Sequence, residues 1–221
     1  MKKTLIIYST VDGHTTKICE EILKHLEHSN QCELQSIDNI DPRKLDDFDW
    51  IIIGASIRYG NHRKSVMDFM KHNQRILQQK GNAFFSVNAV ARKPEKASPE
   101  SNPYVVKFVD RIGWKPHLMA VFAGKIDYPR YNLFDKWAIR LIMTISKGPT
   151  DTSSSFEFTD WEKVKAFAAN ILAEQEKSRV KQGRTRFYFR SSDLWICRKI
   201  YFKQKPLSRS SFCVGKALPP L

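Results

Sequence analysis

Short apolar runs alternate along the chain with longer segments in which apolar residues recur at helical spacing. The runs cover residues 5–8, 50–55, 82–87 and 118–124, and residues 32–36 alternate weakly. The run Trp50–Ala55 is apolar at every position except Gly54, as expected of a strand buried on both faces of a parallel sheet. The pattern therefore predicts five strands, of which the one at 32–36 lies at an edge.

The intervening segments predict helices that cover both faces of this sheet. In residues 14–27, Ile18, Ile22 and Leu26 fall on one helical face, with charged residues between them. Further helices are expected over 63–79, 100–112 and 161–173, with a short turn of helix from Pro42. This alternation predicts an α/β fold, a doubly wound five-stranded parallel sheet of order 2-1-3-4-5 with a long insertion after strand 5. A ligand of such a sheet binds at the carboxyl ends of the strands, where loops 9–15, 55–60 and 86–92 meet.

The first of these loops has the character of a phosphate-binding turn. It joins a strand to a helix start, and it contains no Gly-x-Gly-x-x-Gly and no Gly-Lys-Ser/Thr, which disfavours dinucleotide and triphosphate ligands. Ser9…Gly13-His14-Thr15 resembles the phosphate loop of flavodoxins, in which neutral donors and a helix N-terminus hold the phosphate of FMN. The alternative interpretation is an ordinary turn with Thr15 as a helix cap.

The other two loops suit the flavin ring. Tyr59 offers a flat wall, Gly60 allows close approach of the backbone, Arg58 can offset negative charge on the reduced ring, and the Asn88 amide can face its pyrimidine edge. The residues expected to contact FMN are Ser9, Thr10, Val11, Asp12, Gly13, His14, Thr15, Ala55, Ser56, Ile57, Arg58, Tyr59, Gly60, Ser86, Val87, Asn88 and Ala89.

A compact basic group follows the third loop. Arg92, Lys93 and Lys96, with Arg130 as a further partner, could pair with carboxylates of a substrate. The alternative is a solvated loop. The chain has no cluster with metal-ligand spacing, so no metal site is expected, and its four cysteines form no C-x-x-C pair.

The insertion, residues 125–159, contains an amphipathic segment at about 131–147. One arc of this helix is apolar and the opposite side carries Lys136, Arg140 and Lys147, which is typical of a helix lying in a bilayer interface. A helix that covers the core, or one that forms a contact in a homo-oligomer, is the competing interpretation. The residues of the apolar arc are Leu133, Phe134, Trp137, Leu141 and Ile145.

Charge is distributed unevenly over the 221 residues, whose formal net charge is +14. Residues 178–221 hold 11 Lys+Arg and one acid, whereas residues 1–177 hold 26 and 22. The body is therefore only mildly basic, and no nucleic-acid partner is expected. We expect a folded domain over 1–176 and a basic, disordered tail over 177–221, for which membrane or nucleic-acid contact is the functional alternative. No secretory signal and no run of 18 uncharged apolar residues is found, which predicts folding in the cytosol without a spanning helix.

Several longer motifs together resemble a named family. They are Tyr8-Ser-Thr-x-Asp-Gly-x-Thr15, Ile53-Gly-Ala-Ser-Ile-Arg-Tyr-Gly60, Ser86-Val-Asn-x-Val-Ala-Arg-Lys-Pro-Glu-Lys96, Tyr128-Pro-Arg-Tyr131 and Thr150-Asp-Thr152. Over about residues 1–176 the chain resembles the bacterial flavodoxin-like protoporphyrinogen dehydrogenases, which pass electrons to menaquinone or ubiquinone.

This resemblance implies a flavodoxin-like fold and an FMN enzyme of haem biosynthesis. It would oxidise protoporphyrinogen IX to protoporphyrin IX at the cytoplasmic side of the cell inner membrane, as a peripheral protein, with the basic group orienting the substrate propionates. The redox step falls to the flavin, so no catalytic side chain is assigned, although His14 and His62 are candidates to assist proton loss. A flavodoxin-type electron carrier or NAD(P)H:quinone reductase shares the FMN loops but leaves the insertion and the basic group unexplained, and a non-enzymatic flavin-fold module at the membrane is a third class.

Overall fold

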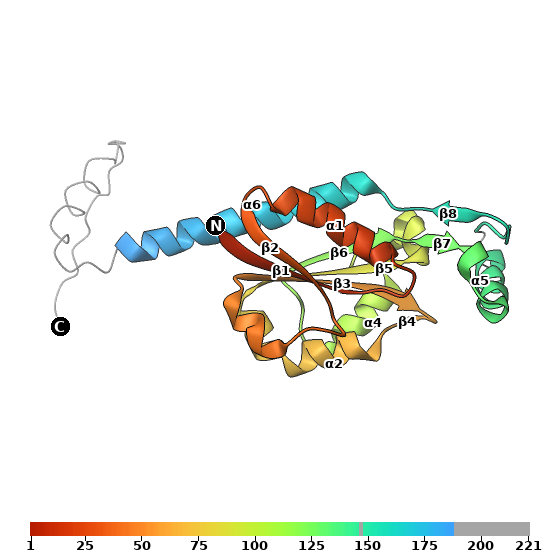
Figure 1. The fold of residues 1–221 in the computed structure, drawn as a ribbon, viewed down its shortest axis with the longest axis horizontal. Helices are drawn as coiled ribbons and strands as arrows, with labels where there is room; N and C mark the ends of the chain where they lie inside the picture. The colour runs from red at the N-terminus through yellow and green to blue at the C-terminus, as the bar shows by residue number, and fades with distance from the viewer. Residues whose placement is uncertain (146–147, 188–221) are drawn as a thin grey trace, which may run out of the picture. The chain divides into compact units, whose positions relative to one another are not determined.

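A five-stranded parallel sheet forms the centre of the protein, with the strand order β2-β1-β3-β5-β6 (Figure 1). The computed structural model describes residues 1–145 and 148–187, and side chains up to residue 179. The predicted sheet and its order 2-1-3-4-5 are confirmed. The strands are β1 (Lys2–Ser9), β2 (Asn30–Ser36), β3 (Trp50–Arg58), β5 (Gly81–Asn88) and β6 (Leu118–Ala123).

Helices cover both faces because alternate side chains of each central strand point to opposite sides. Ile6 and Ile52 pack with residues of α1 (His14–Leu26) and the first part of α6 (Trp161–Phe187), including Val164 and Ile171. On the other face, Ile7 and Ile53 pack with α2 (Lys64–His72), α3 (Gln74–Gln79) and α4 (Pro103–Ile112). Figure 1 shows α1 on one side of the sheet and α2 and α4 on the other. This sandwich buries both sheet faces and leaves the strand ends for ligands.

The helix expected over 63–79 is interrupted at Asn73. Its backbone (φ −102°, ψ 14°) departs from helical values, and its side-chain amide donates to the Phe69 carbonyl at 2.8 Å. A side chain that competes for backbone acceptors in this way favours a helix end. The helix expected over 100–112 starts at Pro103, where the Asn102 side chain caps it, and the turn from Pro42 is confirmed as η1 (Pro42–Asp47).

The insertion forms a small subdomain with its own core. It contains β7 (Lys125–Asp127), η4 (Tyr128–Arg130), α5 (Leu133–Ile145) and β8 (Ser155–Glu157), and β7 pairs antiparallel with β8. Tyr128 is fully buried beside Ile126 and Met143, and its hydroxyl donates to the Pro149 carbonyl at 2.9 Å. The helix predicted over about 131–147 begins at Leu133, two residues later than expected. Residues 146–147 lie outside the described part of the chain.

The last helix is longer than its apolar pattern predicts. The pattern ends at Ala173, whereas α6 continues to Phe187, so the irregular tail expected from residue 177 does not begin there. Residues 174–187 are mostly Glu, Gln, Lys and Arg, which favour a helix without needing an apolar stripe. The chain divides into two compact units, Met1–Glu176 and Lys177–Leu221. The tail prediction for 188–221 concerns residues outside those described.

Candidate functional site

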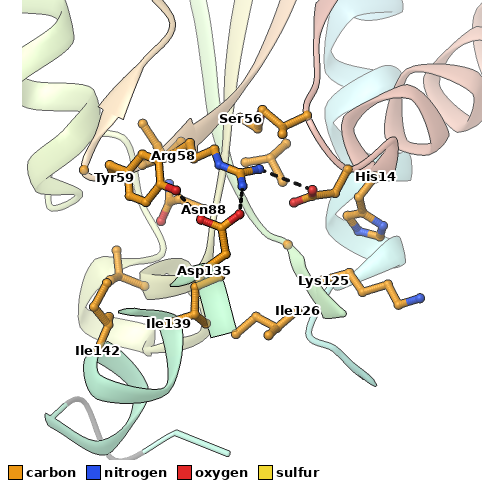
Figure 2. Close-up of a pocket in the computed structure, with 18 of the residues that line it drawn as sticks. His14, Ser56, Arg58, Tyr59, Asn88, Lys125, Ile126, Asp135, Ile139 and Ile142 are labelled. Atoms are coloured by element: carbon orange, nitrogen blue, oxygen red, sulfur yellow. Dashed lines mark hydrogen bonds and ion pairs between the residues drawn. The ribbon is translucent and has the colours of Figure 1, made fainter. Parts of the chain in front are cut away.

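A cavity of about 170 Å³ lies at the carboxyl ends of β1, β3 and β5, where the three predicted loops meet (Figure 2). The insertion closes one side of it through β7 and α5. The lining includes the expected residues Thr10, Val11, Asp12, His14, Thr15, Ser56, Ile57, Arg58, Tyr59, Gly60, Val87, Asn88 and Ala89. It also includes residues that the sequence did not single out as ligands, namely Val90, Tyr104, Gly124, Lys125, Ile126, Tyr131, Asp135, Ala138, Ile139, Ile142 and Met143.

The loop between β1 and α1 presents unsatisfied polar groups. Gly13, at φ 80°, precedes the helix, and no side chain caps the first turn of α1. The Ser9 and Thr15 hydroxyl oxygens are buried and have no hydrogen-bond partner among the described residues. Thr15 is therefore not a helix cap. Buried hydroxyls beside free N–H groups at a helix N-terminus suit a phosphate, so the residues present fit the phosphate of FMN.

His14 is held in one tautomer at the same helix start. Its Nε2 lies 2.6 Å from the Thr159 hydroxyl oxygen, and that hydroxyl donates to the Ala123 carbonyl at 2.8 Å. Nε2 is therefore the protonated nitrogen, and the buried Nδ1 is left as an acceptor. Burial lowers the pKa of His14, despite the nearby Glu157 charge, so the imidazole is neutral near pH 7.

The second loop forms a tight turn between β3 and β4 (Asn61–His62). Tyr59 and Gly60 both have left-handed backbones, with φ of 50° and 76°. Glycine adopts this conformation freely and tyrosine only at a cost, so the fold holds the Tyr59 ring in place at the cavity. The Arg58 guanidinium carbon lies 5.4 Å from the centroid of that ring. Both residues thus line the cavity, and their role as a flavin wall with an adjacent cation stays a prediction.

Asp135 of α5 is the main functional candidate that sequence reasoning missed. Its carboxylate forms an ion pair with Arg58 and accepts a hydrogen bond from the Tyr59 hydroxyl, as the dashed lines in Figure 2 show. A second carboxylate, that of Asp12, lies 3.5 Å from the other Arg58 nitrogen and accepts from the Tyr131 hydroxyl at 3.4 Å. Partial burial opposes the charge of Arg58, but Tyr59, Asp135 and Asp12 outweigh it and raise the pKa of the guanidinium. The four-residue network of Asp12, Arg58, Tyr59 and Asp135 links the insertion to the first and second loops.

The Asn88 side chain lines the cavity and also forms hydrogen bonds within the protein. Its amide donates to the Ser86 hydroxyl at 3.2 Å, and its carbonyl oxygen accepts from the Ala91 N–H at 3.1 Å and from Asn102 at 3.2 Å. These hydrogen bonds hold the backbone of the third loop in place, and a contact of the Asn88 amide with the flavin stays a prediction.

Some expected contacts lie behind the cavity wall. Ala55 and Ser86 are fully buried in the sheet, and Ser9 and Gly13 do not line the cavity either, although the Ser9 hydroxyl is one of the unpartnered groups. Residues next to a buried strand end belong to the core when their side chains point between the sheet and its helices. Neither Ala55 nor Ser86 therefore lines the cavity with its side chain, and a contact of either residue with FMN stays a prediction.

The basic group is also only partly at the cavity. Arg92 lines it and donates to the Ala89 carbonyl at 2.8 Å, whereas Lys93, Lys96 and Arg130 do not line it. The reason is local: Arg92 ends the short helix η2 (Ala89–Arg92), and the chain then turns away through η3 (Pro94–Lys96). Lys125, which does line the cavity, forms an ion pair with Asp127 at 2.9 Å.

His62 is a core residue and not a proton acceptor at the site. Its ring packs against Phe84 and Phe108, with centroid distances of 5.5 and 4.5 Å, and its Nε2 lies 3.0 Å from the Ser86 hydroxyl. Burial lowers its pKa to about 3, so the ring is neutral throughout the physiological range. Among the described residues, no cluster of His, Cys, Asp and Glu could hold a metal.

Comparison with known proteins decides the family. The flavodoxin domain model matches residues 5–153. Protoporphyrinogen IX dehydrogenase (quinone) of Escherichia coli strain K12 is 40% identical over 180 residues, which cover 81% of this chain and 99% of that protein. This chain belongs to the family of quinone-dependent protoporphyrinogen IX dehydrogenases. The family member from Leishmania major is 39% identical over 173 residues, covering 77% of this chain and 75% of that protein.

The family match confirms the resemblance to the protoporphyrinogen dehydrogenases, the flavodoxin-like fold and FMN as the cofactor. Among solved structures, oxidised flavodoxin 1 of Bacillus cereus is similar with a TM-score of 0.47 and 18% identity, over 77% of this chain and 97% of that one.

Proposed function

We propose that this chain oxidises protoporphyrinogen IX to protoporphyrin IX with FMN bound in the cavity and passes the electrons to menaquinone or ubiquinone. The observation that carries the proposal is 40% identity over 99% of the length of the Escherichia coli enzyme. Bound in the cavity, FMN would supply the electron transfer between the substrate and the quinone. The protein binds, orients and controls charge around it.

Each of the three loops has a different role in binding FMN. The Ser9 and Thr15 hydroxyls and the N-terminus of α1 hold the phosphate, because these two hydroxyls of the first loop are buried and have no partner among the described residues. Tyr59 and Arg58 form the wall of the ring site. Asn88 fixes the third loop through its hydrogen bonds to Ser86 and Ala91.

A porphyrinogen carries two propionates, and cationic side chains are suitable partners for them. Arg92 is the residue of the predicted basic group that lines the cavity, so we assign it to a propionate. Lys93 and Lys96 follow it in the chain and are assigned to attraction of the anionic substrate towards the cavity mouth, a longer-range role that tolerates their position outside the lining.

The outward face of α5 supports docking on an anionic bilayer. The predicted arc is exposed to solvent, from 62% at Leu141 to 79% at Leu133, with Trp137 at 72%. The prediction that Lys136 and Arg140 lie opposite this arc is wrong, because the opposite side faces the cavity and carries Asp135, the single acid of α5. The two cations instead flank the arc. An apolar face flanked by cations suits a membrane interface. No helix within the described residues is long and apolar enough to span a bilayer.

With α5 at the membrane surface, the quinone has a route to the cavity. Ile139 and Ile142 of α5 line the cavity while Trp137 and Leu141 of the same helix face outward. A lipid-soluble quinone could therefore pass from the bilayer along α5 to the flavin. We accordingly propose a peripheral location on the cytoplasmic side of the cell inner membrane.

Anaerobic turnover tests the proposed reaction. Purified full-length protein with FMN and protoporphyrinogen IX should produce porphyrin fluorescence in multiple turnovers only when menaquinone or ubiquinone is added. Consumption of NAD(P)H with quinone, and no porphyrin formed, would identify a quinone reductase instead. Absence of both activities in FMN-loaded protein would leave a binding module and refute the proposal.

A further inference from the structure

Helix α5 buries its acidic residue and exposes large apolar residues. Asp135 is 4% exposed, although Leu133 and Phe134 immediately before it are 79% and 76% exposed. A carboxylate is taken out of water only when partners replace its hydration. Here the partners are Arg58 and the Tyr59 hydroxyl, both from the β3–β4 turn, 76 or more residues away in sequence.

The backbone of α5 fixes the carboxylate from its own side as well. The Asn132 side-chain oxygen accepts a hydrogen bond from the Asp135 N–H at 2.8 Å, within the first turn of the helix. Ala138, Ile139 and Ile142 follow Asp135 at helical spacing and line the same cavity. The carboxylate is therefore held by its helix on one side and by the flavin loop on the other.

The charges around Arg58 determine what the flavin ring would experience. The guanidinium alone would stabilise negative charge on a reduced flavin, but it stands between the carboxylates of Asp12 and Asp135. The Asp12 side chain is 41% exposed and is screened by water, whereas the Asp135 side chain is 5% exposed and is screened far less. The other cations lining the cavity are Arg92 and Lys125, and Lys125 is paired with Asp127.

We propose that Asp135 is a positioning residue that holds Arg58 and Tyr59 at the flavin and, through its weakly screened charge beside Arg58, lowers the reduction potential of the bound FMN. This inference rests on the proposed function in one respect, that FMN occupies the cavity. It makes the membrane-facing insertion part of the redox site, because the same helix carries the exposed apolar arc.

The test is the midpoint potential of bound FMN, measured by spectroelectrochemistry on the full chain. Asp135→Asn keeps the shape of the side chain and removes its charge, and should raise the potential by about 30 mV or more, the equivalent of tenfold tighter relative binding of reduced FMN. Asp12→Asn should give a smaller shift in the same direction. Asp135→Glu, which keeps the charge, should remain closer to the wild-type value than Asp135→Asn.

Arg58→Gln tests the same network from its cation and keeps the inference testable if Asp135→Asn fails to fold or to retain FMN. It should lower the potential, since both carboxylates then act uncompensated. Unchanged potentials in FMN-loaded Asp135→Asn and Arg58→Gln, or a shift of Asp135→Glu as large as that of Asp135→Asn, would overturn the inference. Failure of the wild-type chain to bind FMN would instead refute the proposed function.

Discussion

Two buried hydroxyls in the first loop are available to bind the phosphate of FMN. Ser9 and Thr15 flank the phosphate-binding turn, and neither hydroxyl finds an acceptor or donor among the described residues. Thr15→Val keeps the side-chain shape and removes one hydroxyl. A hydrogen bond to a charged group contributes about 1.5–3 kcal/mol, so FMN should bind about 10- to 100-fold more weakly, as measured by fluorescence titration of the apoprotein.

A matched control exists on another helix. The Ser65 hydroxyl in α2 is also buried and unpartnered among the described residues, but Ser65 does not line the cavity. Ser65→Ala should leave FMN affinity unchanged. Equal loss of affinity in both variants would mean that the effect is one of general stability and would contradict the assignment of Thr15 to the phosphate.

His62 should make the folded protein sensitive to acid. Its pKa is about 3 in the folded state and near 6.5 when unfolded, so the unfolded state binds the extra proton as the pH falls through this range. This group's contribution is therefore present above pH 6.5 and is lost on acidification, by about 2 kcal/mol between pH 7 and pH 5. Urea unfolding at saturating FMN should show a smaller loss over that interval in His62→Gln than in the wild type. An identical loss in both would rule out this role.

At the scale of elements, α5 shows what the sequence reveals and what it hides. Its outward arc could be predicted because Trp137 and Leu141 share a face by spacing alone. Asp135 was missed because its partners, Arg58 and Tyr59, are brought to it only by tertiary folding. The visible signal was a single acid placed in register with Ala138, Ile139 and Ile142. Likewise, β7 and β8 are each three residues long, too short to show an alternating pattern.

The outward face of α5 should bind anionic membranes. The double substitution Trp137→Asp and Leu141→Asp should reduce co-sedimentation with anionic liposomes by about tenfold or more, since burying one large apolar side chain contributes about 1.5–3 kcal/mol. FMN content should be retained, because neither side chain lines the cavity.

Val106→Asp provides the control, because Val106 is a half-exposed apolar residue on α4. It should leave liposome binding unchanged. Unaltered co-sedimentation of the double variant would contradict membrane docking. If the wild type is a dimer that does not bind liposomes, and the double variant is a monomer, the arc is a contact between two copies of the chain.

At the scale of the whole molecule, the fold was predictable because long apolar strands and amphipathic helices impose their own period on the sequence. The end of α6 was not, since Glu, Gln, Lys and Arg favour a helix without an apolar stripe. The cavity lining was predictable at the three loops and not at the insertion, where lining residues converge from β7 and α5.

The cavity lies wholly within the unit Met1–Glu176. Removal of residues 178–221 should therefore leave FMN content and turnover unchanged, and it retains the buried hydrogen bond from Gln175 to Thr4 at 3.2 Å. Flavin content by absorbance and turnover with quinone check this expectation. Loss of bound FMN in the shortened chain would show that the second unit contributes to the site.

The most direct test of FMN binding is the absorption spectrum of the purified full-length protein, followed by identification of the flavin that it releases. We predict a yellow protein with stoichiometric, non-covalently bound FMN, or an apoprotein that takes up FMN to that ratio. A colourless protein that refuses FMN and still converts protoporphyrinogen IX would contradict it.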